Sequence, residues 1–141
     1  MARSHPSDAA FRLAEVAFFK GFTDDELRRV AELAEELDAE VGAELTDQGR
    51  PGQEAYVILD GRAGVYISGN LKAEVGAGEI IGEMALIDHH PRVATVRALT
   101  PMKLLAFDTE RFRRLLDEMP KAQVKVMEVL VERLRSLDLE S

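Results

Sequence analysis

The residues best suited to chemistry lie in one stretch, residues 78–96, where two glycines bracket a pair of isoleucines. A helix-compatible run follows Gly82, and such a turn leaves the backbone N–H groups of Ala85 and Leu86 without helical partners. A helix N-terminus of this kind binds anions. Arg92 precedes an apolar, strand-like run and needs a partner if it is buried. A guanidinium that converges with free amides suits a phosphate.

Glu83 has a different character from the rest of this stretch. Its carboxylate would repel a phosphate placed beside it. It is better suited to accept a hydrogen bond from a sugar hydroxyl, or to pair with Arg92. The residues alone therefore leave two interpretations equally open: an anion site, or a simple salt bridge in a glycine-rich turn.

The elements that position this stretch are short and β-rich between residues 39 and 107, where strand-like runs alternate with glycine-containing turns. We expect strands at residues 43–46, 55–59, 64–67, 71–75, 93–99 and 103–107. Their regular spacing predicts a small β-roll or barrel. The 141 residues are enough for one domain with a real core, and we predict a single domain over residues 1–141.

Helices are expected on both sides of the β-rich region, at residues 7–19, 23–37, 108–119 and 120–139. Thr23 and Glu26 have the spacing of a capping box. Apolar residues then recur at helical spacing as far as Leu37, so this helix is predicted to reach about residue 37. Asp108 or Thr109 can cap the third helix, and Pro120 fits the first position of the last one.

The last predicted helix has more apolar residues than one buried face needs. One set follows the spacing of a coiled-coil interface: Met127, Leu130, Leu134 and Leu137. A second set makes the helix apolar on more than one side: Val124, Val126, Val129 and Val131. We predict that one side packs on the barrel while the other forms a homodimer. The alternative, in which every apolar residue packs within the monomer, stays open.

Several runs resemble the cyclic-nucleotide-binding domain family. The family's phosphate-binding cassette is matched in order and spacing by Gly82-Glu83-Met84-Ala85-Leu86 and then Pro91-Arg92-Val93-Ala94-Thr95-Val96. The family's second and third strands and their turn are matched by Gly49-Arg50-Pro51-Gly52 and Tyr56-Val57-Ile58-Leu59-Asp60-Gly61. The flanking helices also fit. The resemblance implies an α+β fold, an antiparallel β-roll (double-stranded β-helix, jelly-roll type) flanked by N-terminal and C-terminal helices.

The resemblance also implies a role for individual residues. Arg92 is expected to pair with the cyclic phosphate and Glu83 to accept the ribose 2′-hydroxyl. The backbone amides of Ala85, Leu86 and Ala94 are expected to complete the phosphate site. Further ligand contacts are expected from Gly82, Met84 and Val93, and from Val65 and Val75 against the base. Lys72 stands where some relatives carry an apolar residue of the base pocket.

The loop Asp88-His89-His90 departs from the family pattern, in which a small or polar loop precedes the proline. A carboxylate close to the phosphate would weaken binding. Adjacent histidines point to different sides of an extended chain, and the sequence offers no evident third ligand, so we expect a solvated loop and no metal. His5 lies in a tail and supports no site.

Composition excludes several classes of function. The net charge of −8 disfavours contact with nucleic acid and with anionic membranes. The chain has no cysteine, no apolar run of membrane-spanning length and no signal-peptide core, so we expect a cytoplasmic protein. No serine stands in a hydrolase elbow and no motif for a nucleoside triphosphate is present, so we expect no enzyme activity and no cofactor.

Three hypotheses remain from the sequence. The first is a sensor that binds cyclic AMP in preference to cyclic GMP, because Val93 offers no hydroxyl where GMP-selective relatives carry threonine or serine. Its ligand would reposition the last helix, with Leu130 or Leu134 closing over the base, and signal to an unidentified effector protein. The second is an interaction domain that keeps the fold but has weak or no nucleotide affinity. The third is a piece of a larger transcription regulator or channel, since transcription-factor relatives continue into a helix-turn-helix.

Overall fold

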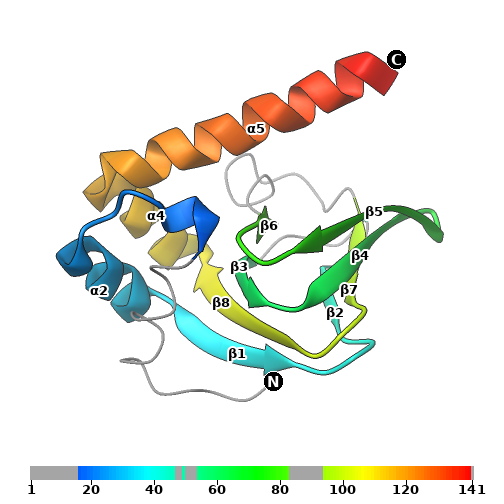
Figure 1. The fold of residues 1–141 in the computed structure, drawn as a ribbon, viewed down its shortest axis with the longest axis horizontal. Coiled ribbons are helices and arrows are strands. Elements are labelled where there is room, and N and C mark those ends of the chain that lie inside the picture. The colour runs from blue at the N-terminus through cyan, green and yellow to red at the C-terminus, as the bar shows by residue number, and fades with distance from the viewer. Residues whose placement is uncertain (1–15, 47–48, 50–53, 83–93, 141) are drawn as a thin grey trace.

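In the computed structural model, two four-stranded antiparallel sheets pack face to face and helices cover one of them (Figure 1). The structure describes residues 16–46, 49, 54–82 and 94–140. Sheet A has the strand order β1-β8-β3-β6 and sheet B the order β2-β7-β4-β5. This confirms the predicted α+β architecture with a β-roll between flanking helices.

The described chain begins with a short 3-10 helix and one α-helix, followed by two strands: η1 (Ala17–Phe19), α2 (Asp24–Leu33), β1 (Glu35–Ala39) and β2 (Glu44–Thr46). The central strands are β3 (Glu54–Asp60), β4 (Arg62–Ile67), β5 (Asn70–Gly76) and β6 (Ile80–Ile81). The last elements are β7 (Thr95–Ala98), β8 (Met102–Asp108), α4 (Thr109–Glu118) and α5 (Pro120–Glu140).

The helix that was expected to reach residue 37 ends at Leu33, so this prediction was wrong. Ala34 is extended, with φ −100° and ψ 158°, and the chain continues as β1. Leu37 pairs with Leu104 of β8 and is buried between the sheets rather than on a helix. The gain from burying Leu37 and Ala39 against β8 overrides the helical spacing of the leucines.

The helix starts follow from the predicted caps. The Glu26 amide donates to Thr23 Oγ1 at 3.2 Å and the Thr23 amide donates to Glu26 Oε1 at 2.8 Å, which completes a capping box. The Asp108 carboxylate accepts from the Arg111 amide at 2.8 Å and caps α4. The predicted helix over residues 7–19 appears in the described part only as η1, and residues 7–15 lie outside it.

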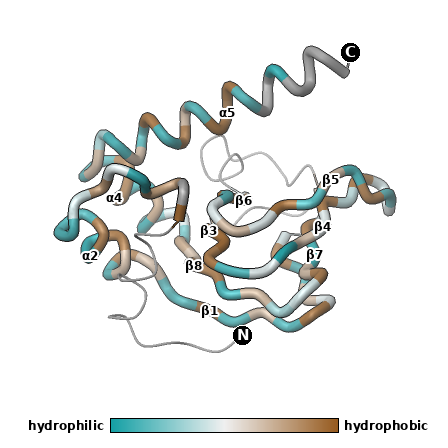
Figure 2. The backbone as a smooth tube through the Cα atoms, viewed as in Figure 1, coloured by the Kyte–Doolittle hydropathy of each residue, from teal (hydrophilic) through white to brown (hydrophobic). Residues whose placement is uncertain are grey.

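Sheet A carries apolar side chains on both faces, and so takes part in two cores. Its inner face meets sheet B in an inter-sheet core that includes Tyr56, Ile58, Ile81 and Leu104. Its outer face meets the helices in a helix-side core that includes Val57, Ile80 and Phe107. The alternation along β3 and β8 places successive residues in opposite cores. Figure 2 shows hydrophobic residues along β3 and at intervals along the helices.

Sheet B carries polar groups on its outer face. Arg97 of β7 stacks on the Tyr66 ring at 5.3 Å and donates to Glu44 at 3.0 Å. The Tyr66 ring lies across Gly64, where an added Cβ would come within 2.8 Å of it. These contacts occupy the outer face of sheet B, whereas its inner face is apolar.

Candidate functional site

The segment that carries the expected phosphate contacts joins the two sheets. Gly82 directly follows β6, the edge strand of sheet A, while Ala94 directly precedes β7 in sheet B. Residues 83–93 between them lie outside the described residues. The residues on either side of this segment therefore belong to different sheets.

The start of the segment is fixed by β6. Ile80 and Ile81 pair with Val57 and Tyr56 of β3 and are both buried. Gly82 then has φ 84°, a left-handed conformation that glycine adopts without steric cost. The structure thus explains the glycine at this position by backbone geometry.

The end of the segment is fixed by a side chain of β2. Thr46 is 7% exposed, and its Oγ1 donates to the Ala94 carbonyl at 2.9 Å. The same oxygen accepts from the Val96 amide at 3.1 Å. Ala94 itself is buried. Both ends of the segment are consequently held by contacts with neighbouring strands, β3 at one end and β2 at the other.

The two valines expected against the base lie on one face of sheet B. Val65 pairs with Ala73 and with Val96, and Val75 pairs with Ala63. Partners in an antiparallel pair share a face, so both valines lie on the inner face. Each is half-buried and packs against the inter-sheet core. Lys72 of β5 is exposed.

The other expected ligand contacts fall outside the described residues. They are Glu83, Met84, Ala85, Leu86, Arg92 and Val93. The loop Asp88-His89-His90 lies there too. Their expected roles stay predictions from the sequence.

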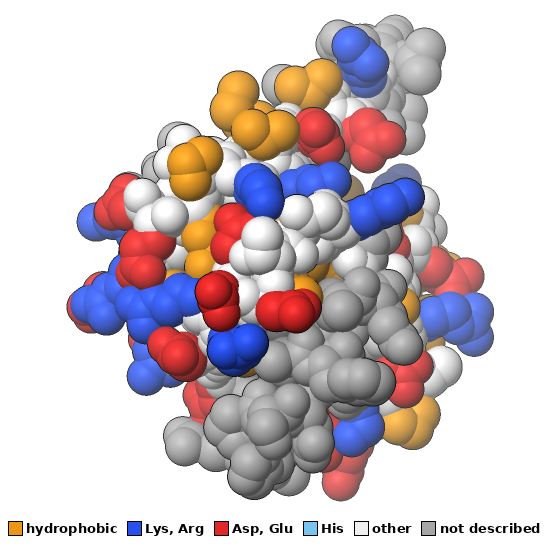
Figure 3. All heavy atoms as spheres, turned by 60° about the vertical axis from the view of Figure 1, so that its left-hand side comes forward, with side chains coloured by type: hydrophobic (Ala, Val, Ile, Leu, Met, Phe, Trp, Pro, Cys, Tyr) orange, Lys and Arg blue, Asp and Glu red, His pale blue; other side chains and the backbone are white. Residues whose placement is uncertain are grey.

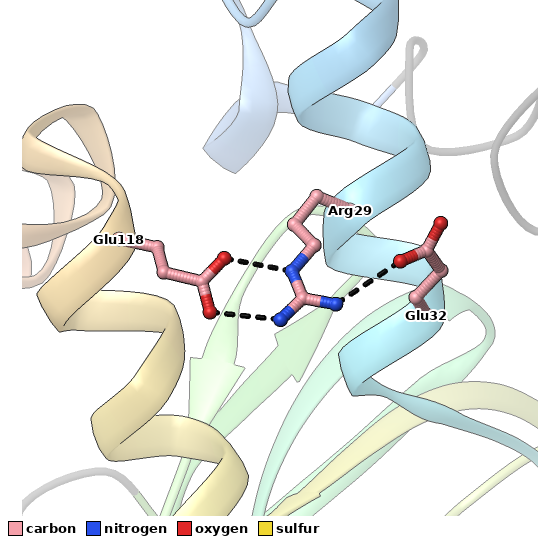
Figure 4. Close-up of polar contacts among 3 residues, drawn as sticks. All are labelled: Arg29, Glu32 and Glu118. Atoms are coloured by element: carbon pink, nitrogen blue, oxygen red, sulfur yellow. Dashed lines mark hydrogen bonds and ion pairs between the residues drawn. The ribbon is translucent and has the colours of Figure 1, made fainter.

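A second polar network ties the helices together (Figure 4). Arg29 of α2 makes a two-point ion pair with Glu118 of α4, with Nε–Oε1 and Nη2–Oε2 distances of 2.7 and 2.8 Å, and also donates to Glu32. These hydrogen bonds hold the pKa of Glu118 below its ordinary value and raise that of Arg29. Lys121 of α5 donates to Glu26 at 2.8 Å and to the Gly21 carbonyl at 3.0 Å. The junction between α4 and α5 is therefore fastened to α2.

Helix α5 divides its apolar residues between two faces in a way that the sequence did not indicate. The face turned to the body contains Ala122, Val126, Val129 and Leu130, all part of the helix-side core or packed against it. The face turned outward contains Val124, Met127 and Val131, which are exposed. Met127 and Leu130 therefore do not form one face, contrary to the spacing argument. The side chains of Leu134 and Leu137 lie outside what the structure describes.

Two of these contacts were missed by sequence reasoning. Thr46 lies 48 residues from Ala94, and Arg29 lies 89 residues from Glu118. A threonine in a strand and an arginine on a helix surface are ordinary in sequence. Their contacts form only because the fold brings distant elements of the chain together.

Two negative findings apply to the described residues. None of the helices there is long and apolar enough to span a membrane. No group of three histidine, aspartate or glutamate side chains in that part of the chain is placed to hold a metal ion.

Comparison with known proteins decides the family. The family model of the cyclic nucleotide-binding domain matches residues 37–119, more than half of the chain. The chain belongs to the cyclic nucleotide-binding domain family. The match includes Gly82 and Ala94, at the two ends of this segment, and also Val65 and Val75.

Solved structures agree with this assignment. The Thermus thermophilus catabolite activator protein is 28% identical with a TM-score of 0.78, over 87% of this chain and 60% of that one. A cyclic nucleotide-binding domain from Methylobacillus flagellatus is 29% identical with a TM-score of 0.73, over 96% and 79%. The regulatory domain of Toxoplasma gondii PKA, crystallised with cAMP, is 26% identical with a TM-score of 0.76, over 90% and 50%. The chain thus spans 60% of the activator and half of the PKA domain.

Proposed function

We propose that this protein is a regulatory module that binds cyclic AMP in preference to cyclic GMP, catalyses no reaction and signals through α5. The observation that carries the proposal is the anchored segment. Gly82 follows a paired strand of sheet A and Ala94 is held by sheet B, and the sequence between them resembles the family's phosphate-binding cassette. The relative from Toxoplasma gondii was crystallised with cAMP.

The proposed site combines charge, backbone and apolar surface. Arg92 pairs with the cyclic phosphate, and Glu83 accepts the ribose 2′-hydroxyl. The backbone amides of Ala85, Leu86 and Ala94 complete the phosphate site. Gly82 and Met84 make further contacts with the ligand. Val65 and Val75 supply apolar surface for the base. The inner face of sheet B supports this arrangement, since both valines are half-buried there and Val65 pairs with Val96, two residues after Ala94.

The preference for cyclic AMP rests on Val93. A hydroxyl at that position could bond the guanine amino group, and valine has none. Losing one such hydrogen bond changes binding by about 0.5–1.5 kcal/mol, so the preference is modest, up to about tenfold. We expect Val93→Thr to reduce this preference for cyclic AMP over cyclic GMP.

The experiment is a calorimetric titration of the chain with each nucleotide. Arg92→Ala is expected to weaken cyclic AMP binding by about 2–5 kcal/mol, as for one partner of a buried ion pair. Glu83→Ala costs less, about 1–3 kcal/mol. Arg97→Ala is the matched control, because Arg97 lies on the outer face of sheet B and pairs with Glu44. Equal loss in both arginine variants, or no binding by the wild type, rejects the proposal.

The outward face of α5 supports a signalling surface. Figure 3 shows hydrophobic side chains gathered along this helix, and Met127 is 63% exposed. We propose a second copy of the chain as its partner, since spacing of three and four residues along one face suits helix pairing. An effector protein would respond to the position of α5.

The proposal also includes what the module does not do. The net charge of −8 opposes binding to DNA, which a mobility shift at low salt would test. The absence of catalysis is a proposal because one similar structure, 28% identical, is a cAMP-binding acyltransferase from Mycobacterium smegmatis, of which this chain covers 42%. A cytoplasmic location remains a prediction.

A further inference from the structure

Thr46 replaces part of a backbone ladder at the edge of sheet B. The register of β2 against β7 shifts between Glu44 and Thr46, where two steps along β2 oppose one step along β7. Such a bulge disrupts the regular backbone hydrogen bonds. The Thr46 hydroxyl takes over there, since it donates to the Ala94 carbonyl and accepts from the Val96 amide. We call these two hydrogen bonds the Thr46 bridge.

The Thr46 bridge fixes two successive peptide groups. The Ala94 carbonyl belongs to the peptide before Thr95, and the Val96 amide belongs to the peptide after it. Both hydrogen bonds are buried, so water cannot replace either one at low cost. The orientation of the chain at Ala94, directly after residues 83–93, is therefore set by Thr46 of β2.

We propose that Thr46 is a positioning residue for the cyclic nucleotide. It acts by holding the Ala94 backbone in the orientation from which the Ala94 amide reaches the phosphate. The inference rests on the proposed function and adds a residue that does not touch the ligand. A small rotation of the chain at Ala94 would tilt that amide away from the anion, and preorganised donors lose strength when they must reorient.

Thr100 offers a matched comparison at the other end of β7. Its hydroxyl also accepts from a backbone amide, that of Arg62 at 2.9 Å, and donates to a backbone carbonyl, that of Pro101 at 3.0 Å. If Thr46 only stabilises the fold, removing its hydroxyl should affect nucleotide affinity no more than removing that of Thr100. If Thr46 positions the ligand site, removing its hydroxyl should weaken nucleotide binding more.

The first experiment measures cyclic AMP affinity by calorimetry, at a temperature where every variant is folded by circular dichroism. Thr46→Val keeps the shape and removes the hydroxyl, and we expect binding about tenfold weaker. Thr46→Ser keeps the hydroxyl and should bind within about twofold of wild type. Thr100→Val should also bind within about twofold. Equal affinity of Thr46→Val and wild type overturns the inference, as does equal weakening in both valine variants.

The second experiment uses the wild type and does not depend on a variant that folds. If the Thr46 bridge favours the bound state, the ligand must favour the bridge by the same factor. Saturating cyclic AMP should therefore slow hydrogen exchange of the Val96 amide more than that of the Arg62 amide, which Thr100 holds. Because the ligand slows global unfolding for every amide, the difference between these two isolates the local effect. Equal slowing of both overturns the inference.

The two proposals fail in different ways. If the wild type binds neither cyclic nucleotide, the proposed function is wrong and the role of Thr46 falls with it. If the wild type binds and Arg92→Ala weakens binding while Thr46→Val does not, the function stands and only the positioning role is rejected.

Discussion

Substituting Val126 by alanine tests whether α5 is coupled to the ligand. Val126 is 3% exposed and lies in the helix-side core, in contact with the body of the protein. Alanine removes two methylene equivalents, each about 0.8 kcal/mol of transfer free energy, and leaves a cavity. We expect the free energy of unfolding to fall by about 2 kcal/mol, measured by urea denaturation.

The same substitution should also change affinity if α5 responds to the nucleotide. Val126→Ala destabilises every state in which α5 is docked, and hardly affects a state in which it is detached. A ligand that prefers the docked helix then binds the variant more weakly. Since 1.4 kcal/mol corresponds to tenfold, a loss of about 2 kcal/mol sets an upper limit of about thirtyfold on the weakening.

The control for this experiment is Val124→Ala on the outward face of the same helix. Val124 is exposed, so the same chemical change should alter both the stability and the affinity little. The reasoning is refuted if Val126→Ala loses the expected stability and still binds cyclic AMP within twofold of wild type. In that case α5 packs on the barrel without sensing the ligand.

Two further predictions concern the helices. Arg29 holds the pKa of Glu118 below its ordinary value of 4.5, so this ion pair stabilises the fold above pH 4.5 and the stabilisation is lost as the pH falls further. The difference in unfolding free energy between wild type and Glu118→Gln, measured in urea, should therefore shrink between about pH 5 and 3. A difference that does not change with pH contradicts this. Met127→Lys should shift a dimer toward monomer in sedimentation, whereas Val41→Lys, a control with the same 63% exposure, should not; equal behaviour argues against pairing through α5.

Local signals in the sequence predicted much of this fold because their causes are local. The capping box of Thr23 and Glu26 needs only residues three apart, and it formed as expected. The turn at Ser68-Gly69 has positive φ at both residues, the geometry of a tight hairpin between β4 and β5. The six strands that were expected all appear, with ends shifted by no more than two residues.

The errors arose where distant partners decide the conformation. The chain of β1 is rich in acidic residues, which are poor strand formers, and its leucine continues a helical pattern. Only pairing with β8, some 70 residues later, makes it a strand. The β6 strand has two residues and no pattern of its own. The faces of α5 were misassigned for the same reason, because spacing cannot say which face meets the barrel.

The candidate site divides in the same way. The cassette residues could be named because their order and spacing resemble those of the family, and their roles stay predictions. The bulge that places Thr46 beside Ala94 could not, since it depends on the register between β2 and β7. Positioning residues are generally of this kind, because their role comes from a tertiary contact rather than from their chemistry.

A packed route connects the start of the segment to α5. The two residues of β6 precede Gly82, and their side chains enter different cores: Ile81 the inter-sheet core and Ile80 the helix-side core. Val126 of α5 belongs to the same helix-side core as Ile80. A shift of the chain at Gly82 would therefore displace side chains on both faces of sheet A, because a close-packed interior transmits strain.

The ion pairs at the other end of this core determine what could move. Glu118 is held by Arg29 and Lys121 by Glu26, so α4 and the first turn of α5 are fastened to α2. A displacement of Ile80 could then be accommodated by two different movements of the helices. Either the three helices shift together on sheet A, or α5 bends beyond its fastened first turn. Val126→Ala weakens the contact on which both depend, whereas Glu118→Gln loosens only the junction. The effects of the two variants on cyclic AMP affinity would distinguish these movements. If the whole helical unit moves, both variants should change the affinity. If α5 moves alone, only Val126→Ala should change it.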